Sequence, residues 1–241
     1  MEGAPGTCSG YASRYWDCCK PHCGWQANVP PRMHPVSSCS SDNESWEDNY
    51  TIQSSCDGGD AHTCFGLVPF AVSNALSYGF AATSEGDVCG RCYQLDFTSG
   101  RVAGKRMVVQ AINLGYDVAG NQFDLLIPGG GLGLKNACAN QWNVLPRQLG
   151  EQYGGFLKSC QLKYGTDDVS VLKSCVADYC DTVFGTNGLT ELHAGCEWFL
   201  TWYDIADNPE VLFKEVVCPA ELIEMTGMNR APLHDINHSC D

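Results

Sequence analysis

Short apolar segments separated by turn residues run along the chain, and this pattern predicts a protein built mainly of β-strands. Apolar positions alternate or cluster briefly at residues 91–98, 105–112 and 123–127, and Ser99-Gly100 and Pro128-Gly129 close the first and third of these runs. The first two runs predict a hairpin. We expect further strands at 198–203 and 212–217, and short helices at 70–82 and 219–225.

Short strands with glycine-rich connections favour a closed β-barrel that carries long loops. The segment from about 160 to 195 is expected to be an irregular insertion. Because the chain has no Pro/Ser/Thr-rich linker and no internal repeat, residues 1–241 are interpreted as one domain, without a carbohydrate-binding module.

The 16 cysteines predict a secreted, extracellular protein, since thiols in this number persist as disulfides in oxidising compartments, and the even count favours eight bridges. Asn-x-Ser/Thr tripeptides at Asn43, Asn49 and Asn237 are consistent with a glycoprotein. The first five residues lack the apolar core of a signal peptide, so we interpret the chain as a mature form behind an initiator Met.

Charge and composition exclude several classes of partner. Fourteen Lys and Arg against 28 Asp and Glu give a net charge of −14, which opposes binding to nucleic acid or to anionic lipid. No apolar run approaches the ~18 residues of a spanning helix. We therefore expect no nucleic-acid and no membrane partner. The chain is also expected to be a monomer.

No cofactor and no metal are predicted from the remaining motifs. Cys89-Gly90-Arg91-Cys92 lacks a second ligand pair, and of the six histidines only His234 and His238 are spaced i, i+4, without the glutamate of an H-E-x-x-H motif between them. The glycine run 129–133 lacks the Lys-Ser/Thr of a phosphate loop, and a tight turn or a close backbone approach to a ligand explains it better.

Residues 13–25 place an acid among aromatic side chains and cysteines. Asp17 follows Tyr15 and Trp16, and Trp25 closes the segment. Aromatic faces stack on sugar rings and carboxylates cleave the bonds between them, so this segment suggests polysaccharide cleavage. A buried Trp beside a structural Asp explains the residue types as well, and from these types alone it is the favoured alternative.

A second acidic segment covers residues 113–133. Asp124 interrupts an apolar strand pattern, and wrapping by Phe123 and Leu125 would raise its pKa and suit it to donate a proton. Asp117 lies seven residues earlier across a glycine-containing loop. The alternative, that both aspartates cap turns, stays open.

Ser13-Arg14-Tyr15-Trp16-Asp17-Cys18-Cys19-Lys20-Pro21 resembles the signature of glycoside hydrolase family 45 endoglucanases. The similarity covers about residues 13–227, with a poor match at 160–195. Further similar segments follow in the family's order: 80–84, 92–95, 97–100, 104–110, 123–133, 206–209 and 217–222.

This resemblance implies a six-stranded double-psi β-barrel that cuts the β-1,4-glucosidic bonds of cellulose and cellooligosaccharides internally, with inversion. Asp17 then matches the general base, Asp124 the general acid, and Asp117 an assisting carboxylate on a mobile loop. Residues expected to face substrate are Ser13, Tyr15, Trp16, Trp25 and Asn113.

The resemblance also implies disulfide pairings: Cys18–Cys138, Cys19–Cys56, Cys23–Cys89, Cys39–Cys64, Cys92–Cys218 and Cys180–Cys196. Four cysteines remain, and among their three connectivities Cys160–Cys175 with Cys8–Cys240 is preferred. Gly90 and Met228 stand where many relatives have a cysteine pair. Gln122 stands where fungal members commonly have a histidine, so the surroundings of Asp124 are expected to differ.

Two alternative functions remain at this stage. One is a non-hydrolytic, expansin-like protein that binds glycans and loosens cell walls; it would retain a counterpart of Asp124 but no base, and the presence of Asp17 argues against it. The other keeps the enzyme and changes the polymer to glucomannan, xylan or a mixed-linkage glucan such as lichenan.

Overall fold

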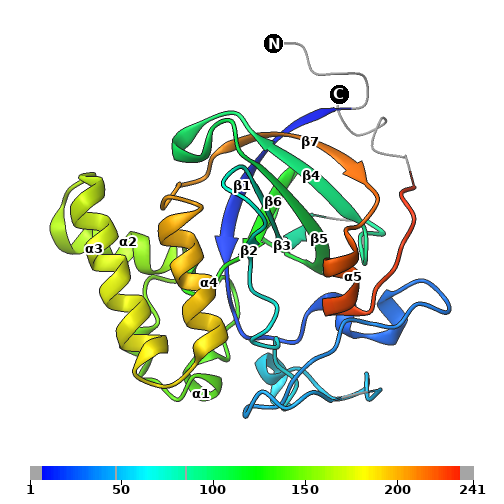
Figure 1. Ribbon diagram of the computed structural model, residues 1–241. Helices are drawn as coiled ribbons and strands as arrows, with labels where there is room; N and C mark the ends of the chain where they lie inside the picture. Colours follow the sequence, from blue (N-terminus) through cyan, green and yellow to red (C-terminus); the bar gives the residue numbers. More distant parts are fainter. Residues whose placement is uncertain (1–6, 47, 85, 234–241) are drawn as a thin grey trace.

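The computed structural model describes residues 7–46, 48–84 and 86–233, and six of its strands close into a β-barrel (Figure 1). The strand bounds are β1 Cys8–Tyr15, β2 Phe70–Ala71, β3 Leu76–Thr83, β4 Cys92–Phe97, β5 Arg106–Leu114, β6 Gln122–Leu126 and β7 Glu210–Val216.

The barrel order is β3-β5-β4-β7-β1-β6, and β6 returns to pair with β3. Two pairs are parallel, β1 with β6 and β3 with β5, while the remaining barrel pairs are antiparallel. This is the double-psi β-barrel expected from the sequence. Closure leaves no free edge in the barrel, and the two-residue β2 pairs with β3 outside it.

The parallel pair β1–β6 positions the acidic segments. Ser13 lies opposite Asp124 in its register, and Tyr15 lies opposite Leu126. Asp17 follows β1 by two residues. Residues 13–17 and 124, which are far apart in sequence, are therefore neighbours because of strand pairing.

Strand positions predicted at 91–98, 105–112, 123–127 and 212–217 are confirmed, and β4 and β5 form the expected antiparallel hairpin. The helix predicted at 70–82 is wrong: β2 and β3 occupy it, with a turn between them. The strand β1 is absent from the sequence prediction. The buried Arg14 and the exposed Tyr11 hide the apolar alternation.

Large apolar side chains fill the barrel interior. Phe80, Leu95, Met107, Ile112 and Leu125 are fully buried. Phe123 packs edge-on against Phe213, with ring centroids 4.8 Å apart. Burial of this apolar surface is the main stabilising term of the barrel.

Helices flank the barrel. Their bounds are α1 Cys138–Gln141, α2 Gly155–Tyr164, α3 Val169–Cys180, α4 Thr190–Thr201 and α5 Ala220–Thr226, and a π-helical turn covers Asp181–Gly185. Figure 1 shows α2, α3 and α4 gathered on one side of the barrel. The helix predicted at 219–225 is confirmed as α5.

The prediction of an irregular insertion at 160–195 is wrong, since these residues are mostly helical. The strand predicted at 198–203 is also wrong, because α4 continues to Thr201. A short apolar run in a sequence does not distinguish a buried helix from a buried strand. Disulfides Cys160–Cys175 and Cys180–Cys196 join α2 to α3 and α3 to α4.

Seven disulfides connect described residues, and all six pairings implied by the family resemblance are among them, together with Cys160–Cys175. The expected Cys8–Cys240 bridge lies outside the described residues, as does Asn237. No described helix has the length and apolar character needed to cross a bilayer.

The glycine run 129–133 begins with a tight turn, one of the two expected roles, in which the Gly130 N–H donates to the Ile127 carbonyl at 2.8 Å. The run also makes a close backbone contact, and the partner is protein. A Cβ on Gly155 would lie 1.9 Å from the Gly129 carbonyl oxygen, so no larger residue fits there. The Phe156 N–H donates to that same carbonyl oxygen at 2.9 Å. This contact seats the beginning of α2 against the loop after β6.

Candidate active site

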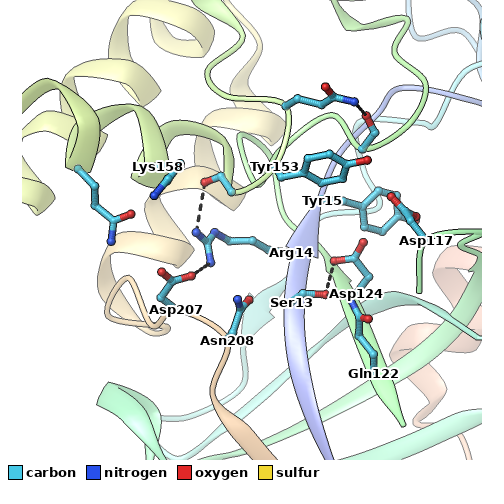
Figure 2. A pocket seen from close by; sticks show the side chains of 14 residues that line it. Ser13, Arg14, Tyr15, Asp117, Gln122, Asp124, Tyr153, Lys158, Asp207 and Asn208 are labelled. Atoms are coloured by element: carbon cyan, nitrogen blue, oxygen red, sulfur yellow. Dashed lines mark hydrogen bonds and ion pairs between the residues drawn. The ribbon is translucent and has the colours of Figure 1, made fainter. Parts of the chain in front are cut away.

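Two adjacent cavities meet at the acidic residues. The first has a volume of about 460 Å³ and the second about 270 Å³, and both are lined by Tyr15, Asp117, Asp124 and Gly133. Asp17 lines the second cavity only. Figure 2 shows the first cavity, with Asp117, Asp124 and Tyr15 close together.

Asp17 is held by backbone contacts on both of its sides. Its carboxylate accepts a hydrogen bond from the Cys19 N–H at 2.9 Å, and its carbonyl oxygen accepts one from the Ala137 N–H at 2.9 Å. Cys18 adopts a left-handed conformation, with φ at 62°, and is bridged to Cys138. The turn therefore fixes the direction in which the Asp17 carboxylate points.

Burial raises the pKa of Asp17 to about 7. The backbone hydrogen bond from Cys19 and the positive charge of Lys135 oppose this rise, and the Asp117 carboxylate adds to it. At neutral pH the Asp17 carboxyl is thus available in its ionised form as a base stronger than an ordinary aspartate.

Asp124 lies in β6 and is partly buried. The Ser13 hydroxyl donates to its Oδ1 at 2.6 Å. Burial raises the pKa of Asp124 to about 7, and the negative charges of Asp117 and Asp17 contribute to this rise while the Ser13 hydrogen bond opposes it. The expectation that apolar surroundings raise this pKa agrees with the structure.

Asp117 lies in the loop that joins β5 to β6 and lines both cavities. Its charge acts on Asp17 and on Asp124. The loop is closed by a hydrogen bond from the Val118 N–H to the Gly115 carbonyl, and the Gly115 N–H donates to Thr83 of β3. The structure therefore brings all three predicted aspartates to one place.

Comparison with known proteins agrees with this arrangement. The family model of Glycosyl hydrolase family 45 matches residues 9–229. The chain belongs to glycosyl hydrolase family 45. An endoglucanase from Cryptopygus antarcticus is 37% identical over 93% of this chain and 90% of its own length. Endoglucanase B of Cellvibrio japonicus (strain Ueda107) is 55% identical over 98% of this chain, which spans 48% of that protein.

A solved structure has the same fold. The crystal structure of cellulase from the Antarctic springtail Cryptopygus antarcticus superposes with a TM-score of 0.76 at 35% identity, and the match covers 94% of this chain and 99% of that one. The family 45 resemblance carried by residues 13–21 is thus confirmed over most of the chain.

Among the residues expected to face substrate, Tyr15 and Asn113 line the second cavity. The Asn113 amide donates to the Tyr15 hydroxyl at 3.1 Å and accepts from the His22 N–H at 2.8 Å. Ser13 lines the first cavity and its hydroxyl bonds to Asp124. In this family 45 chain Asn113 and Ser13 therefore also orient other groups of the site.

Trp25 and Trp16 differ in accessibility. Trp25 lines the second cavity, with the Lys20 ammonium 3.5 Å from its ring centroid. Lys20 is fixed in turn by the carbonyl oxygens of Tyr50 and Ile52, at 2.8 and 2.9 Å. The expectation that Trp16 faces substrate is wrong, because its side chain is 0% exposed and packs in the core. The alternative given for this segment, a buried Trp beside the acid, applies to Trp16.

Several residues of the cavities were absent from the sequence prediction. Arg14 donates to Asp207 at 2.7 Å and to the Gly154 carbonyl at 3.2 Å. Lys158 and Gln161 of α2 line the first cavity. Their segment lies in the poorly matched region 160–195 or just before it, so sequence offered little signal for the residues on α2.

One described group of side chains could hold a metal ion, namely Asp181, His193 and Glu197, whose ligand atoms lie within 4.8 Å of one another. His193 Nε2 lies 2.8 Å from an Asp181 carboxylate oxygen. The three residues belong to the helical insertion and line neither cavity. They are therefore separate from the three aspartates.

Proposed function

We propose that this family 45 chain is a secreted endo-β-1,4-glucanase that hydrolyses internal glucosidic bonds of cellulose with inversion of configuration. The single observation that carries this proposal is that Asp17 and Asp124 line one cavity, each with a desolvated carboxyl group. The relatives named endoglucanase support the same reaction class.

In the proposed reaction the ionised Asp17 accepts a proton from a water molecule. The water oxygen attacks the anomeric carbon from the face opposite the leaving group, and Asp124 gives its proton to the departing glucosidic oxygen. The bond from the anomeric carbon to that oxygen breaks as the new bond to water forms. Asp17 ends protonated and Asp124 ends ionised, and exchange with solvent restores both.

Inversion requires the two carboxyl groups to stand about 6.5–9.5 Å apart so that the water fits between Asp17 and the sugar. Asp117 assists by stabilising the positive charge that develops on the sugar and by keeping a proton on Asp124 through its own negative charge. We assign the substrate-binding surface to Trp25 and Tyr15, whose aromatic side chains line the second cavity.

Location and organisation complete the proposal. The seven disulfides among described residues support secretion, because such bridges persist outside reducing compartments. We propose that residues 1–241 act as a single catalytic domain and as a monomer. Size-exclusion chromatography with light scattering tests the monomer.

The decisive experiment follows cellotetraose cleavage by proton NMR at early times. An α-anomer that appears first supports inversion, and a β-anomer first contradicts it. A rapid fall in the viscosity of carboxymethylcellulose relative to the release of reducing ends identifies internal cleavage. Binding to cellulose without any cleavage contradicts the hydrolase and favours the expansin-like alternative.

A further inference from the structure

A chain of hydrogen bonds leads from the proposed acid to the outer end of the site. Ser13 donates to Asp124 Oδ1 at 2.6 Å, and the Gln122 amide nitrogen lies 2.7 Å from the Ser13 hydroxyl oxygen. The Tyr11 hydroxyl lies 2.7 Å from Gln122 Oε1. Figure 2 shows Ser13, Asp124 and Gln122 beside one another.

The Ala119 backbone N–H sets the direction of this chain. It donates to Gln122 Oε1 at 3.3 Å, and a backbone N–H can only donate. A flipped Gln122 amide would place its NH₂ group against this N–H, so the oxygen must face Ala119 and the nitrogen must face Ser13. Ser13 therefore accepts from Gln122, and its own proton is directed to Asp124.

This direction determines which oxygen of Asp124 carries the proton. Oδ1 accepts from Ser13, so the proton of the neutral acid must lie on Oδ2. Among described residues no hydrogen bond engages Oδ2, and Asp124 lines both cavities. The transferable proton is thereby placed on the oxygen left free for a substrate.

The same amide links the acid to the Asp117 loop, because Ala119 follows Asp117 by two residues in that loop. Movement of the loop that breaks the Ala119 contact would free the Gln122 amide to rotate. The position of Asp117 and the protonation of Asp124 would then change together.

Other charged and titratable groups act on Asp124 in the folded chain. Asp17 and Asp117 raise its pKa by repulsion, and Arg14 lowers it. The phenols of Tyr15 and Tyr203 are the remaining titratable groups that interact with it. Among described residues none of these groups is hydrogen-bonded to Gln122, whose titratable partner is Tyr11. The neutral Gln122→Met change therefore alters the hydrogen-bonded chain without adding a charge.

We propose that Gln122 is a positioning residue of the proposed general acid. Ala119 and Tyr11 hold its amide oxygen, so its amide nitrogen donates to Ser13 and the Ser13 hydroxyl donates its hydrogen bond to Asp124 Oδ1. This arrangement keeps the transferable proton of Asp124 on Oδ2. The assignment of the acid rests on the proposed function.

The test compares Gln122→Met, Gln122→Glu and the control Gln94→Met, which makes the same replacement in β4 outside the cavities. Two substrates are used, cellotetraose and 2,4-dinitrophenyl β-cellotrioside. Departure of dinitrophenolate needs no proton from the enzyme, whereas departure of a sugar does. Loss of a well-placed acid therefore affects the first substrate alone.

We expect kcat for cellotetraose to fall about 10-fold or more in both Gln122 variants, within the range that proton transfer contributes, with KM nearly unchanged. The dinitrophenyl substrate should be cleaved at close to the wild-type rate. In Gln122→Glu the new carboxylate competes for the Ser13 proton, so the pKa of Asp124 rises and the alkaline limb of the pH profile moves to higher pH. The control should behave as wild type.

Equal losses on both substrates would overturn the proposal, because they indicate general disruption of the site. Titration of carbon-13-labelled aspartate side chains by NMR supplies a readout that requires no activity. An unchanged Asp124 pKa in Gln122→Glu also overturns the proposal, even if wild type proves inactive on glucans. Wild-type inactivity rejects the proposed function, and the same titration of Gln122→Met, which adds no charge, then decides the positioning role. A raised Asp124 pKa is expected there, because Ser13 is no longer held as a donor to Oδ1, and an unchanged pKa rejects that role.

Discussion

Asp17 and Asp124 line the same cavity from two separate segments, and burial is the largest cause of the raised pKa in both, at about 7. Each carboxyl group also carries an opposing hydrogen bond, from the Cys19 N–H or from the Ser13 hydroxyl. Desolvation therefore outweighs hydrogen bonding at both positions, and the two groups titrate in the same range.

Because Asp17 is needed ionised and Asp124 protonated, these two pKa values predict a bell-shaped pH dependence. Below both apparent pKa values Asp17 is protonated and no base is present, and above both Asp124 is ionised and no acid is present. The form with one proton is most populated between the two values, so kcat/KM on a soluble neutral glucan should be greatest near neutral pH and fall on both sides. A plateau that extends down to about pH 4, the ordinary aspartate range, would contradict these pKa values.

The raised pKa values also predict an effect on stability. The folded chain binds more protons than the unfolded chain between about pH 4 and pH 7, so these two groups make the free energy of unfolding fall as pH rises through that window. Asp17→Asn and Asp124→Asn remove the ionisation and keep an oxygen that accepts the same hydrogen bond.

Each Asn variant should therefore melt at a higher temperature than wild type at pH 8 and at nearly the same temperature at pH 4. One pKa unit corresponds to about 1.4 kcal/mol, and a chain of this size gains about 2–4 °C for each kcal/mol. Calorimetry at the two pH values measures the difference. Turnover should meanwhile fall about 100-fold or more in each variant. Equal melting shifts at both pH values would show that ionisation is not the cause.

Asp117→Asn should reduce kcat less than substitution of either other aspartate. Asp117 acts on Asp124 through charge, and its removal lowers the pKa of Asp124 and so moves the alkaline limb of the pH profile to lower pH. Measured pH profiles of kcat/KM check this direction. A loss as large as that of Asp124→Asn would instead place Asp117 in direct contact with the reacting atoms.

Sequence reasoning located the site because its residues are concentrated in two contiguous segments, 13–25 and 113–133. Their proximity was expected only from the family resemblance, and in the structure it arises from the parallel pairing of β1 and β6. β1 was missed because Arg14, which belongs to the site, is buried where an ordinary strand has an apolar residue, while Tyr11 is exposed.

The helices between residues 155 and 201 show where hydrophobic periodicity fails to predict secondary structure. Trp198 and Phe199 belong to an apolar run that fits either a buried strand or a buried helix, and packing decides for α4: the Trp198 ring stacks on Trp202 with centroids 5.3 Å apart. Residue type was equally uninformative at Trp16. Its neighbour Tyr15 lines the cavity, whereas Trp16 is fully buried in the core.

The Cys18–Cys138 disulfide should matter for catalysis as well as for stability. It joins residues 120 apart, next to the proposed base. Replacing both cysteines by alanine should lower the free energy of unfolding by about 2–5 kcal/mol and reduce kcat by more than the loss of folded protein explains, because the turn that aims Asp17 is released.

The matched control for that variant replaces Cys39 and Cys64, whose bridge spans 25 residues and whose side chains line neither cavity. It should lose stability and retain kcat per folded molecule. Activity measured at a temperature where both variants are folded separates the two effects. Equal kcat losses in the two variants would assign no special role to Cys18–Cys138.

Gly90 and Met228 can be bridged by a new disulfide. A Cβ on Gly90 would lie 3.4 Å from the Met228 Cβ, close to the separation of about 3.5–4.5 Å found in disulfides. Gly90 has φ at 80°, so any side chain there carries a conformational cost of about 1–2 kcal/mol. Cys92–Cys218 already joins the same two segments, which leaves only a short additional loop to close.

We therefore expect Gly90→Cys with Met228→Cys to form the bridge without a large gain in stability. Intact mass before and after reduction reports the bond, and thermal melting of both forms reports its effect. The reduced form should melt below wild type, and oxidation should recover most of that loss because it offsets the cost at Gly90. A melting temperature far above wild type would show that the strain at φ 80° is smaller than supposed, and failure to oxidise would show that the two Cβ atoms are not aligned for a bridge.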